Sequence, residues 1–434
     1  MCDRCRARDF LCNSRPMVKR MRILLYSANF APEPTGIGKY SGEMAQWLVE
    51  HGHTVRVVAA PPYYPSWKVD PAYAWPPYRR EIWNGVEVSR APLWVPAAPG
   101  GLSRILHLLS FAISSFPVML RQVFWRPDLV ITVAPAFLCA PTGLIIARLT
   151  GAQSWLHLQD FEVDLAFRMG LLKGNLLRRM VLRMERGLLR RFDCVSSISS
   201  RMVEQLLKKG VPLERTRYFP NWVDITHIKP TAVTSTYREE LGIARDAKVV
   251  LFSGSLGGKQ GLMVIPAVAK LLAARTDIVF VICGDGVMKP RLEAAAEGLT
   301  NIRFLPLQPF ERLGELLCTA DIHLLPQAPD VADLVLPSKL SGMLASGRPV
   351  ISTCKPGTEL ETVVSKCGLV IAPDDDDAFA AAVCKLTDNT PLRTELGRRA
   401  RHYAETNFER DAILGRLFGP DGGDESRVTN DAIA

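Results

Sequence analysis

The chain has 434 residues, of which 48% are hydrophobic, 22% are charged and 8% are aromatic. At roughly 150 residues per domain this length predicts about two or three domains, and the composition excludes disordered, collagen-like and disulfide-scaffold proteins. The net charge of +9 is uneven, because residues 1–225 hold 30 Lys and Arg against 17 Asp and Glu, while the rest hold 23 against 27.

Residues 1–20 are expected to be a disordered extension, because the first convincing strand begins directly after Met21. They carry six basic and two acidic side chains and no continuous apolar run, so no secretory signal is predicted. Cys2, Cys5 and Cys12 would supply three zinc ligands, but a closed structural site usually needs four, so disorder is favoured over metal binding. The other seven cysteines lie mostly in apolar segments, which is typical of reduced thiols in a cytosol.

From Met21 onward, short β-branched runs alternate with longer helical patterns, as in βα units around a parallel sheet. A first series of strands is predicted at Arg22–Tyr26, Thr54–Ala59, Val86–Arg90, Leu129–Val133, Ser154–Leu158 and Cys194–Ser197. A second series is predicted at Val249–Ser253, Val279–Cys283, Ile302–Leu305, Ile322–Leu325, Val350–Thr353 and Leu369–Ile371. The sequence therefore predicts two doubly wound α/β domains whose strands end at one cleft, where ligands of such sheets bind.

Two glycines follow the first strand in the run PTGIGKY, before a helical pattern. Gly36 and Gly38 would let the backbone approach a ligand, and the N–H groups of the helix start would favour an anionic group. A tight turn between strand and helix explains the same glycines equally well.

One long apolar run, Ile105–Leu120, has 16 residues and contains His107 and Pro117. It is shorter than the roughly 20 residues that cross a bilayer, so no transmembrane helix is predicted. The run Leu102–Arg126 is instead a candidate second membrane contact, beside the basic segment described next.

Polar residues gather where the strand Ser154–Leu158 ends. His157 and Asp160, with Glu162 and Asp164 after them, are predicted to face the cleft, where a carboxylate or imidazole would hold a hydroxyl group in position. A capped loop with solvated acids is the alternative.

The segment from Arg168 to Arg217 holds 13 basic and four acidic residues. Apolar residues recur there at helical spacing, at Leu176, Leu177, Met180, Val181, Met184, Leu188 and Leu189. This predicts an amphipathic basic helix suited to anionic headgroups. In the favoured interpretation the apolar stripe packs on the N-terminal sheet and only the arginines meet a membrane. Charge alone would also suit nucleic acid or phosphorylated substrates.

Residues 226–247 contain Pro230, a polar run and no strand-like segment, which predicts a linker. Beyond it, the strand Val249–Ser253 runs into GSLGGKQG, in which four glycines, Gly254 the first, flank Lys259. Amide donors with one ammonium group suit a diphosphate, although the spacing is not that of a Walker A loop. A flexible turn with a solvated lysine is the alternative.

Two further motifs follow in the second half. The next strand ends at CGDG, which includes Gly284. The run LPSKL then predicts a helix start with Ser338 as N-cap and Lys339 just inside, where it would hold phosphates from a second side. Residues 420–434 are polar and are expected to be disordered.

The joint order of these motifs resembles glycosyltransferase family 4, the retaining GT-B enzymes that use nucleotide sugars. The resemblance runs from Met21 to about Gly419, through GIGKY, FPNWVD, FSGSLGGKQGL, CGDG, NIRFLPLQP, ADIHLLPQ, PSKLSGMLASGRPVI and CGLVIAPDD. The run WLHLQDFEVDLAFRMGLLK resembles the exopolysaccharide enzymes of the colanic-acid type.

This resemblance implies a GT-B fold with two Rossmann-like domains. Residues 21–225 would form the acceptor domain, residues 248–395 the nucleotide-sugar donor domain, and a helix at 396–419 would return to the first domain. Lys259 would contact the donor diphosphate and the backbone near Arg303 would hold the base. The remaining donor-binding candidates are Gly36, Gly38, Gly254, Gly284, Ser338 and Lys339, and the catalytic candidates are His157 and Asp160.

The sequence departs from the family in one place. The family often carries two glutamates eight residues apart, and this chain has Leu334 and Gly342 at those positions. A glycine at the second position removes a usual contact to the ribose.

The expected function is therefore transfer of a hexose from a nucleoside-diphosphate sugar to a lipid-linked saccharide in exopolysaccharide biosynthesis. The enzyme would be cytoplasmic and peripheral on the inner face of the cell membrane, with an anionic membrane surface as partner. No metal or other cofactor is expected, and no nucleic-acid partner, since zinc-finger spacing and RNP-type motifs are absent. The alternatives are a GT-B nucleotide-sugar epimerase and a non-catalytic relative that binds donor or lipid.

Overall fold

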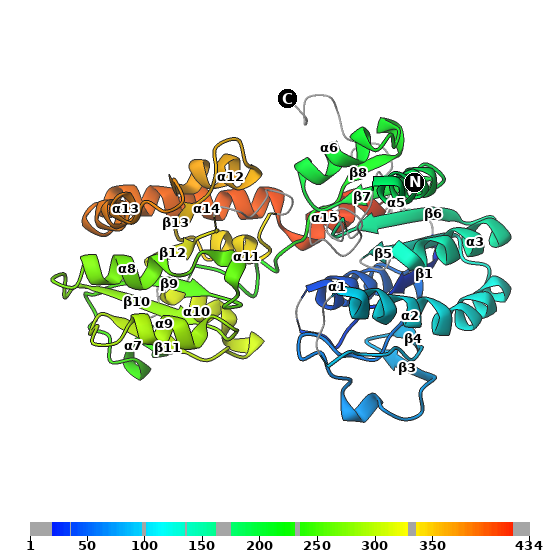
Figure 1. Ribbon diagram of the computed structural model, residues 1–434, viewed down its shortest axis with the longest axis horizontal. Helices are drawn as coiled ribbons and strands as arrows, with labels where there is room; N and C mark the ends of the chain where they lie inside the picture. The colour runs from blue at the N-terminus through cyan, green and yellow to red at the C-terminus, as the bar shows by residue number, and fades with distance from the viewer. Residues whose placement is uncertain are drawn as a thin grey trace, which may run out of the picture.

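A computed structural model describes residues 20–34, 36–97, 101–134, 137–161, 175–230, 235–328 and 336–419. The described chain forms two α/β domains, with the N-terminal domain on the right and the C-terminal domain on the left in Figure 1. The three N-terminal cysteines, the tail 420–434 and the positions Glu162, Asp164 and Leu334 lie outside the described residues.

The N-terminal domain contains an eight-stranded sheet in the order β3-β4-β2-β1-β5-β6-β7-β8. Neighbouring strands are parallel except for the edge pair β3 and β4. The strands are β1 (Arg22–Ser27), β2 (Thr54–Ala59), β3 (Arg79–Trp83), β4 (Val86–Arg90), β5 (Leu129–Ala134), β6 (Gln153–Leu158), β7 (Cys194–Ser197) and β8 (Thr216–Tyr218).

The C-terminal domain contains a six-stranded sheet in the order β11-β10-β9-β12-β13-β14, with every pair parallel. This is the strand order of a dinucleotide-binding Rossmann sheet, in which ligands bind beyond the carboxyl ends of the first and fourth strands. The strands are β9 (Lys248–Ser253), β10 (Ile278–Cys283), β11 (Ile302–Leu305), β12 (Ile322–Leu325), β13 (Val350–Thr353) and β14 (Gly368–Ile371).

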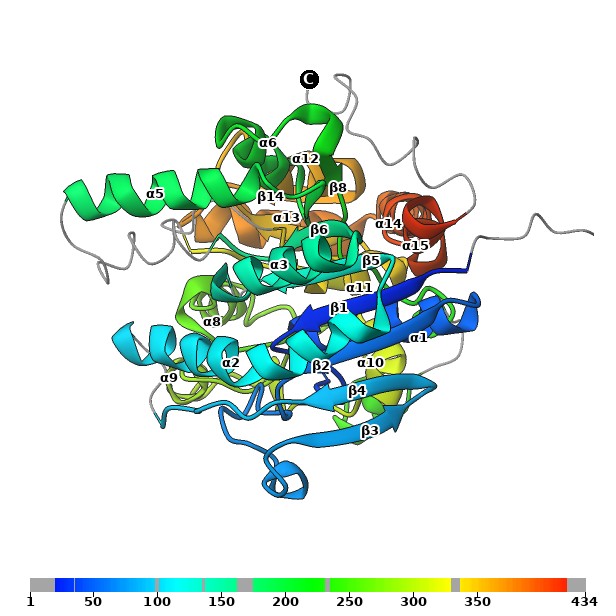
Figure 2. The same ribbon diagram turned by 90° about the vertical axis from the view of Figure 1, so that its right-hand side faces the viewer.

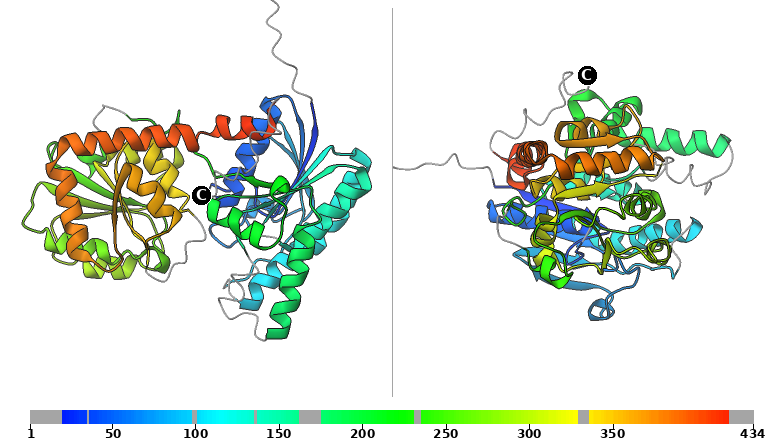
Figure 3. Two further views of the ribbon diagram at one scale, coloured as in Figure 1. Left: turned by 90° about the horizontal axis from the view of Figure 1, so that it is seen from above. Right: turned by 90° about the vertical axis from the view of Figure 1, so that its left-hand side faces the viewer.

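Helices cover both faces of each sheet, as the several views in Figures 1–3 show. In the N-terminal domain they are α1 (Gly36–Glu50), α2 (Gly101–Gln122), α3 (Ala140–Thr150), α5 (Asn175–Leu189) and α6 (Ser200–Lys208). In the rest of the chain they are α7 (Thr236–Glu240), α8 (Val264–Leu271), α9 (Lys289–Ala295), α10 (Leu313–Thr319), α11 (Lys339–Ala345), α12 (Glu359–Cys367), α13 (Asp376–Asp388), α14 (Thr390–Asn407) and α15 (Arg410–Phe418).

All twelve predicted strands are confirmed, each within one residue at its ends. Two strands were not predicted. β3 is an edge strand with half-buried or exposed side chains, and β8 has only three residues, so neither shows the apolar run of a buried parallel strand. The seven cysteines in the described residues are free thiols.

The segment predicted as a linker contains a helix that belongs to the C-terminal core. Tyr237 of α7 is fully buried and packs with Val249 and Leu251 of β9 and Leu316 of α10. A five-residue helix with one buried side chain leaves no periodic pattern, so the sequence did not reveal it.

The chain crosses between the domains twice, at residues 219–226 and 407–410, and the two crossings meet in a bridge between Val223 and Glu409. Beyond the second crossing, α15 places Ile413, Leu414 and Phe418 in the core of the N-terminal domain. Figure 3 shows α14 along the C-terminal domain and α15 reaching the N-terminal one.

The helices α2 and α5 each show a feature that the sequence analysis did not predict. The helix α2 continues through Pro117, and by length and composition the segment Ser103–Trp125 could cross a membrane. One side of α2 nevertheless packs on the sheet, where Phe111 and Met119 are fully buried. Part of the apolar stripe of α5 was expected to pack on the sheet and does not, because Leu176, Met180 and Met184 are 81%, 53% and 66% exposed, whereas Leu189 is buried.

Candidate active site

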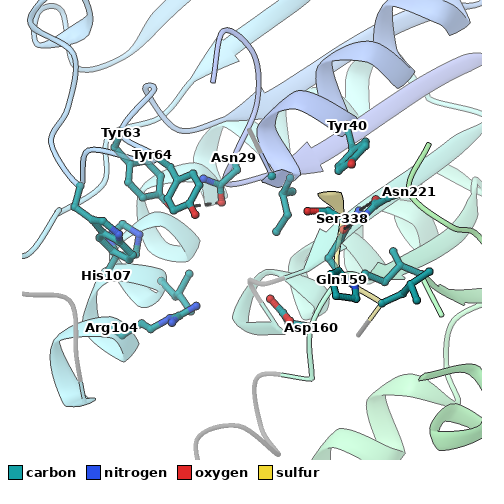
Figure 4. A pocket seen from close by; sticks show the side chains of 17 residues that line it. Asn29, Tyr40, Tyr63, Tyr64, Arg104, His107, Gln159, Asp160, Asn221 and Ser338 are labelled. Atoms are coloured by element: carbon teal, nitrogen blue, oxygen red, sulfur yellow. Dashed lines mark hydrogen bonds between the residues drawn. The ribbon is translucent and has the colours of Figure 1, made fainter. Parts of the chain in front are cut away.

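A pocket of about 350 Å³ lies between the domains, at the carboxyl ends of β1 and β6. Its wall is made by residues after β1, the start of α1, the loop after β2, the first half of α2, the end of β6, and residues 336–338 of the C-terminal domain. Figure 4 shows polar and aromatic side chains pointing into it from both sides: Asn29, Tyr40, Tyr63, Tyr64, Arg104, His107, Gln159, Asp160, Asn221 and Ser338.

Asp160, a predicted catalytic residue, lines this pocket. Beside it, the amides of Gln159 and Asn221 exchange two hydrogen bonds of 3.1 Å, each donating one N–H to the oxygen of the other. This pair joins the end of β6 to the crossing between the domains. It fixes the floor of the pocket next to the Asp160 carboxylate (Figure 4).

His157, the other predicted catalytic residue, does not reach the pocket, and its prediction as a catalytic group is corrected. The ring is buried inside the sheet against Phe219, with 4.5 Å between ring centroids. Its Nε2 accepts a hydrogen bond from Gln159 at 3.0 Å, and its Nδ1 lies 2.9 Å from the hydroxyl of Ser196. Burial lowers the pKa of His157 to about 3, so the ring is neutral at physiological pH. His157 therefore positions Gln159.

An aromatic loop after β2 forms the opposite end of the pocket, with Tyr63, Tyr64 and Trp67 in its lining. One buried carboxylate holds this loop, because Glu33 Oε1 accepts hydrogen bonds from the backbone N–H groups of Tyr63 and Tyr64 at 3.2 and 3.1 Å. Burial raises the pKa of Glu33, although hydrogen bonds from Asn29 and the two backbone groups oppose this effect.

The two glycines of the first motif have different surroundings. Gly36 lines the pocket at the start of α1. Gly38 is buried on the next turn, where a Cβ atom would overlap the side chain of Glu33. The expectation that Gly38 approaches a phosphate is therefore corrected, because its glycine makes room for the carboxylate that holds the aromatic loop.

His107 and Arg104 complete the aromatic end from one side of α2. The Nδ1 of His107 lies 2.6 Å from the backbone oxygen of Trp94 and, since a carbonyl only accepts, it carries the ring proton. Its Nε2 is buried without a hydrogen-bond partner, and burial lowers the pKa of the ring. A neutral His107 thus offers an acceptor among the rings of Tyr63 and Trp67, with centroids 4.8 and 5.4 Å away.

In the C-terminal domain, the turns after β9 and β10 lie in direct contact. A Cβ atom on Gly284 would overlap the backbone oxygen of Gly254, and both glycines have a positive φ, of 150° and 134°. Only glycine permits this approach of two backbones. A backbone hydrogen bond joins the two turns, because the N–H of Gly254 donates to the backbone oxygen of Cys283 at 2.9 Å, and Gly254 is half-buried at the carboxyl edge of the sheet.

Lys339, the first residue of α11, lies beside the Gly254 turn at this edge. Its Nζ is buried without a hydrogen-bond partner, 4.1 Å from the ring centroid of Phe252 and 3.5 Å from the position of a Cβ on Gly254. Burial lowers the pKa of Lys339 to about 8. Two glycine turns and an unpartnered buried amine would suit an anionic ligand, because such an amine gains most from a negatively charged partner.

Ser338 lines the interdomain pocket directly before Lys339. The prediction that it caps α11 is wrong, since Ser338 has helical backbone angles and its side chain makes no capping hydrogen bond. The Ser338 hydroxyl is therefore left to the pocket, one residue from the amine at the glycine turns.

Two other donor-site predictions have less support in the geometry. The backbone of Lys259 lies in a single turn of helix at Gly258–Gln260, and its side chain is outside the described part of the structure. The prediction at Arg303 concerned its backbone, and the Arg303 side chain donates to the backbone oxygens of Thr300, Ile302 and Leu241. A nucleotide base in this region would therefore contact the backbone at the end of β11.

The glycine that departs from the family pattern faces an apolar contact. A Cβ on Gly342 of α11 would lie 3.3 Å from Leu317 of α10 and 3.6 Å from Ile228. Within the described ranges, no group of three or more His, Cys, Asp or Glu side chains is placed to hold a metal ion.

Sequence analysis missed several pocket residues: Asn29, Tyr40, Tyr63, Tyr64, Trp67, Arg104, Gln159 and Asn221. Some lay inside quoted motifs, with Gln159 in LQDFE and Asn221 in FPNWVD, but a single amide carries no pattern. The aromatic run PPYYPSW was a usable signal, since exposed aromatic rings close to a strand end are typical of binding surfaces.

Both halves of the chain match known families. Residues 35–222 match the family described as "Glycosyl transferase 4-like domain", and residues 247–389 match that described as "Glycosyl transferases group 1". One relative, named as colanic acid biosynthesis glycosyl transferase WcaI of Escherichia coli K12, is 39% identical over 404 residues, which cover 91% of this chain and 98% of the relative.

Solved structures share the whole architecture. Sucrose-phosphate synthase of Thermosynechococcus elongatus matches with a TM-score of 0.69 and 18% identity, over 92% of this chain and 97% of that one. Alr3699/HepE of Anabaena, solved in complex with UDP-glucose, matches with a TM-score of 0.64 and 16% identity, over 92% and 98%. At these identities the likeness shows the fold, which is GT-B, as the sequence predicted.

Proposed function

The chain belongs to the glycosyltransferases built from a glycosyl transferase 4-like domain and a glycosyl transferase group 1 domain, and we propose that it transfers a hexose from a nucleoside-diphosphate sugar to a lipid-linked saccharide. The anomeric configuration of the sugar is retained. The donor occupies the C-terminal side of the cleft, and the acceptor occupies the N-terminal side.

The buried amine of Lys339 carries this proposal. Its Nζ has no hydrogen-bond partner and lies beside the Gly254 turn, so the donor diphosphate would supply the missing partner. In this proposal Lys259 would contact the same diphosphate, as the family resemblance implies. The solved complex of Alr3699/HepE with UDP-glucose supports a nucleotide-sugar donor in this fold.

The N-terminal half of the pocket has the composition of a saccharide site. Aromatic rings of Tyr63, Tyr64 and Trp67 give flat apolar surfaces, and the unpartnered Nε2 of His107 accepts a hydrogen bond from a hydroxyl group. Such a mixture of apolar walls and a few polar groups is typical of small-molecule pockets. The guanidinium of Arg104 lines the same end and suits the phosphate that links a saccharide to its lipid.

Transfer with retention requires little covalent chemistry from the protein. The acceptor oxygen bonds to the anomeric carbon on the face from which the diphosphate leaves, and the hydroxyl proton passes to the departing phosphate oxygen. Lys339 and Lys259 stabilise the charge that develops on the diphosphate. The Asp160 carboxylate, fixed beside the Gln159 and Asn221 pair, orients the reacting hydroxyl group.

The biological setting follows from the relative and from the charge distribution. The relative WcaI is named for colanic acid biosynthesis, which supports an exopolysaccharide role here. Residues 1–225 carry an excess of 13 positive charges, which attracts the anionic inner face of the cell membrane. We therefore place the enzyme in the cytoplasm, bound peripherally to that membrane.

The test is a transfer assay with a panel of radiolabelled nucleotide sugars, with and without a membrane extract that contains polyprenyl-linked saccharides. The proposal predicts that at least one donor transfers its label to the organic phase, and that this happens only when the extract is present. NMR of the product should show that the new linkage has the same anomeric configuration as the donor. Conversion of the nucleotide sugar into its epimer would support the epimerase alternative. Donor binding without any turnover would support the non-catalytic one.

A further inference from the structure

The helices α2, α3 and α5 form one outer face of the N-terminal domain, called here the three-helix face. Figure 2 shows them lying one above another on the same side of the sheet, and Figure 1 shows this side turned away from the C-terminal domain. The three helices contain seven arginines and one glutamate. That glutamate, Glu185, is buried and paired with Lys209 at 2.5 Å.

Exposed apolar side chains gather on this face and at its edges. Along α2 and the turn after it they recur at helical spacing, as Leu106, Leu109, Ile113, Phe116, Leu120 and Phe124, with Ile113 65% and Phe124 91% exposed. Further examples are Leu138, Ile145 and Leu149 at α3, and Leu176, Met180 and Met184 on α5. Among the described residues of the C-terminal half, only four large apolar side chains are equally exposed, and they are dispersed: Leu271, Val287, Leu307 and Phe310.

Arginines and amphipathic aromatic residues border the apolar side chains. Arg121, Arg148, Arg178 and Arg183 are exposed. Trp94 and Tyr78, each about half exposed, are tied to α2 by hydrogen bonds from the Trp94 N–H to the Ser110 hydroxyl and from the Tyr78 hydroxyl to the Ser114 backbone oxygen. Trp and Tyr favour the headgroup level of a bilayer, and arginine favours lipid phosphate.

We propose that the three-helix face lies on an anionic lipid bilayer, with the apolar side chains of α2, α3 and α5 inserted at the boundary of the acyl chains. The arginines would contact the lipid phosphates around them. A helix with one apolar and one polar side binds membranes in this orientation, parallel to the surface. The α2 helix cannot cross the membrane in this arrangement, because its inner side packs on the sheet through Phe111 and Met119.

This orientation places the pocket beside the lipid surface. The first half of α2 contributes Arg104, His107 and Leu108 to the pocket wall and Leu106 and Leu109 to the exposed stripe. A lipid-linked saccharide could thus enter the pocket while its lipid stays in the bilayer. The proposal rests on the proposed function for the identity of that acceptor only, since the surface itself is argued from its apolar and charged composition.

The inference is more specific than electrostatic attraction and differs from it in salt dependence. Contacts between arginines and phosphates weaken as salt rises, because charges separated by more than a Debye length of about 8–10 Å are screened. Insertion of leucine, isoleucine and phenylalanine is not screened. Binding should therefore show a salt-sensitive part and a remainder that persists at high salt.

The test is co-sedimentation with vesicles of phosphatidylcholine, alone or mixed with phosphatidylglycerol, from about 0.05 M to about 0.5 M NaCl. The apolar variant carries Ile113→Asp, Leu120→Asp and Phe124→Asp. Its matched control carries Leu271→Asp, Val287→Asp and Leu307→Asp, the same charge change on exposed side chains of the C-terminal domain. A third variant changes Arg178, Arg179, Arg183 and Arg186 to Gln.

We expect wild type and control to bind mixed vesicles equally, and the apolar variant to bind at least about tenfold more weakly at high salt. The Arg→Gln variant should lose mainly the low-salt part. Equal binding by the apolar variant and its control would overturn the proposal. So would a wild-type dimer in sedimentation velocity that the apolar variant converts to a monomer, since the face would then be an interface between copies.

Two further measurements separate this proposal from the proposed function. The vesicles contain neither nucleotide sugar nor acceptor, so binding is scored without catalysis. Transfer to a detergent-solubilised acceptor should be unchanged in the apolar variant, because none of its three positions lines the pocket. Unchanged melting temperatures would show that the variants fold.

Discussion

At the scale of single residues, the buried amine of Lys339 has a stability cost that the proposed contact with a diphosphate would explain. An amine with a pKa of about 8 in the folded chain, against 10.5 normally, is harder to protonate in the folded than in the unfolded state. Between these two pH values the unfolded chain binds more protons, so stability rises with pH there, and the cost is fully present below pH 8.

We therefore predict that Lys339→Met stabilises the unliganded protein at pH 7, by the order of 3 kcal/mol from the pKa shift. The gain should shrink between pH 8 and 10.5. Thermal unfolding across a pH series measures this, with Lys385→Met on the exposed surface of α13 as control. A lower melting temperature for Lys339→Met at pH 7 would show that the amine has a stabilising partner in the free protein.

His157 leads to a prediction about the pH dependence of transfer. Its pKa of about 3 keeps the ring neutral from pH 5 to 8. Titration of His157 therefore causes no rise or fall of the transfer rate with pH in that range. His157→Gln should lower kcat roughly fivefold to tenfold, the effect of losing one hydrogen bond of about 1 kcal/mol to Gln159.

The shape of the profile should be the same for wild type and for His157→Gln, with exposed His402→Gln as a control of unchanged activity. A wild-type limb near pH 6.5 that disappears in His157→Gln would contradict the positioning role. It would restore His157 as an acid or base.

The residues of the candidate site, in the pocket and at the glycine turns, could be predicted from the sequence only where a motif carried them. Gly254, Gly284 and Lys339 belong to patterned runs, and the structure brings all three together. His157 was misassigned, because the sequence does not tell whether a side chain near a strand end faces inward or toward the cleft. Gly38 was misassigned, because the sequence does not show that Glu33 occupies the space beside it. The buried pair of Gln159 and Asn221 joins positions far apart in the chain, which no local pattern reveals.

At the scale of elements, the loop after β2 depends on one turn of α1. Gly38 leaves space for Glu33, and Glu33 holds the backbone of Tyr63 and Tyr64. A loop that builds the N-terminal side of the pocket is thus fixed by a glycine on a different element.

Gly38→Ala should move Glu33, release the aromatic loop and lower stability by about 1–3 kcal/mol, as overpacking does. The KM for the acceptor should rise, and affinity for a nucleoside diphosphate should stay within about threefold, because Lys339 is untouched. Gly187→Ala in α5 is the matched control, since no atom lies within 4 Å of its added Cβ. Equal acceptor KM values for the two variants would disprove the link between α1 and the loop.

Most elements were predictable because parallel strands are buried on both sides and form continuous apolar runs. The exceptions are the exposed edge strand β3, the three-residue β8 and the short α7. The stripe of α5 was expected to pack on the sheet, but its N-terminal half is exposed. Amphipathic spacing predicts the helix and does not identify what covers its apolar side.

At the scale of the whole molecule, the helix α15 follows the C-terminal domain in the sequence but packs in the core of the N-terminal domain. Phe418 of α15 is buried in the N-terminal core, 5.3 Å from Trp155 and 6.4 Å from Phe219 between ring centroids, although the preceding α14 packs on the C-terminal domain. The helix α15 therefore contributes to the core of the domain that contains β1.

Phe418→Ala should cost about 3–5 kcal/mol, the usual result of removing a buried ring. The loss should appear as earlier unfolding of the N-terminal domain, measured by thermal denaturation with and without a nucleoside diphosphate. Phe124→Ala removes a ring that is 91% exposed, so it should leave the melting temperature unchanged. A melting curve for Phe418→Ala that overlays wild type would mean that α15 does not complete the core.

The central claim is that one cleft binds a nucleotide-sugar donor on its C-terminal side and an acceptor on its N-terminal side. The most direct test measures nucleoside-diphosphate affinity by calorimetry and sugar transfer to the lipid-linked acceptor for Lys339→Met and Asp160→Asn together. We predict that Lys339→Met weakens nucleotide binding by about 10²-fold, whereas Asp160→Asn binds nucleotide within about threefold of wild type and loses at least about 10²-fold in transfer rate. Wild-type nucleotide affinity in Lys339→Met, or wild-type transfer in Asp160→Asn, would contradict the claim.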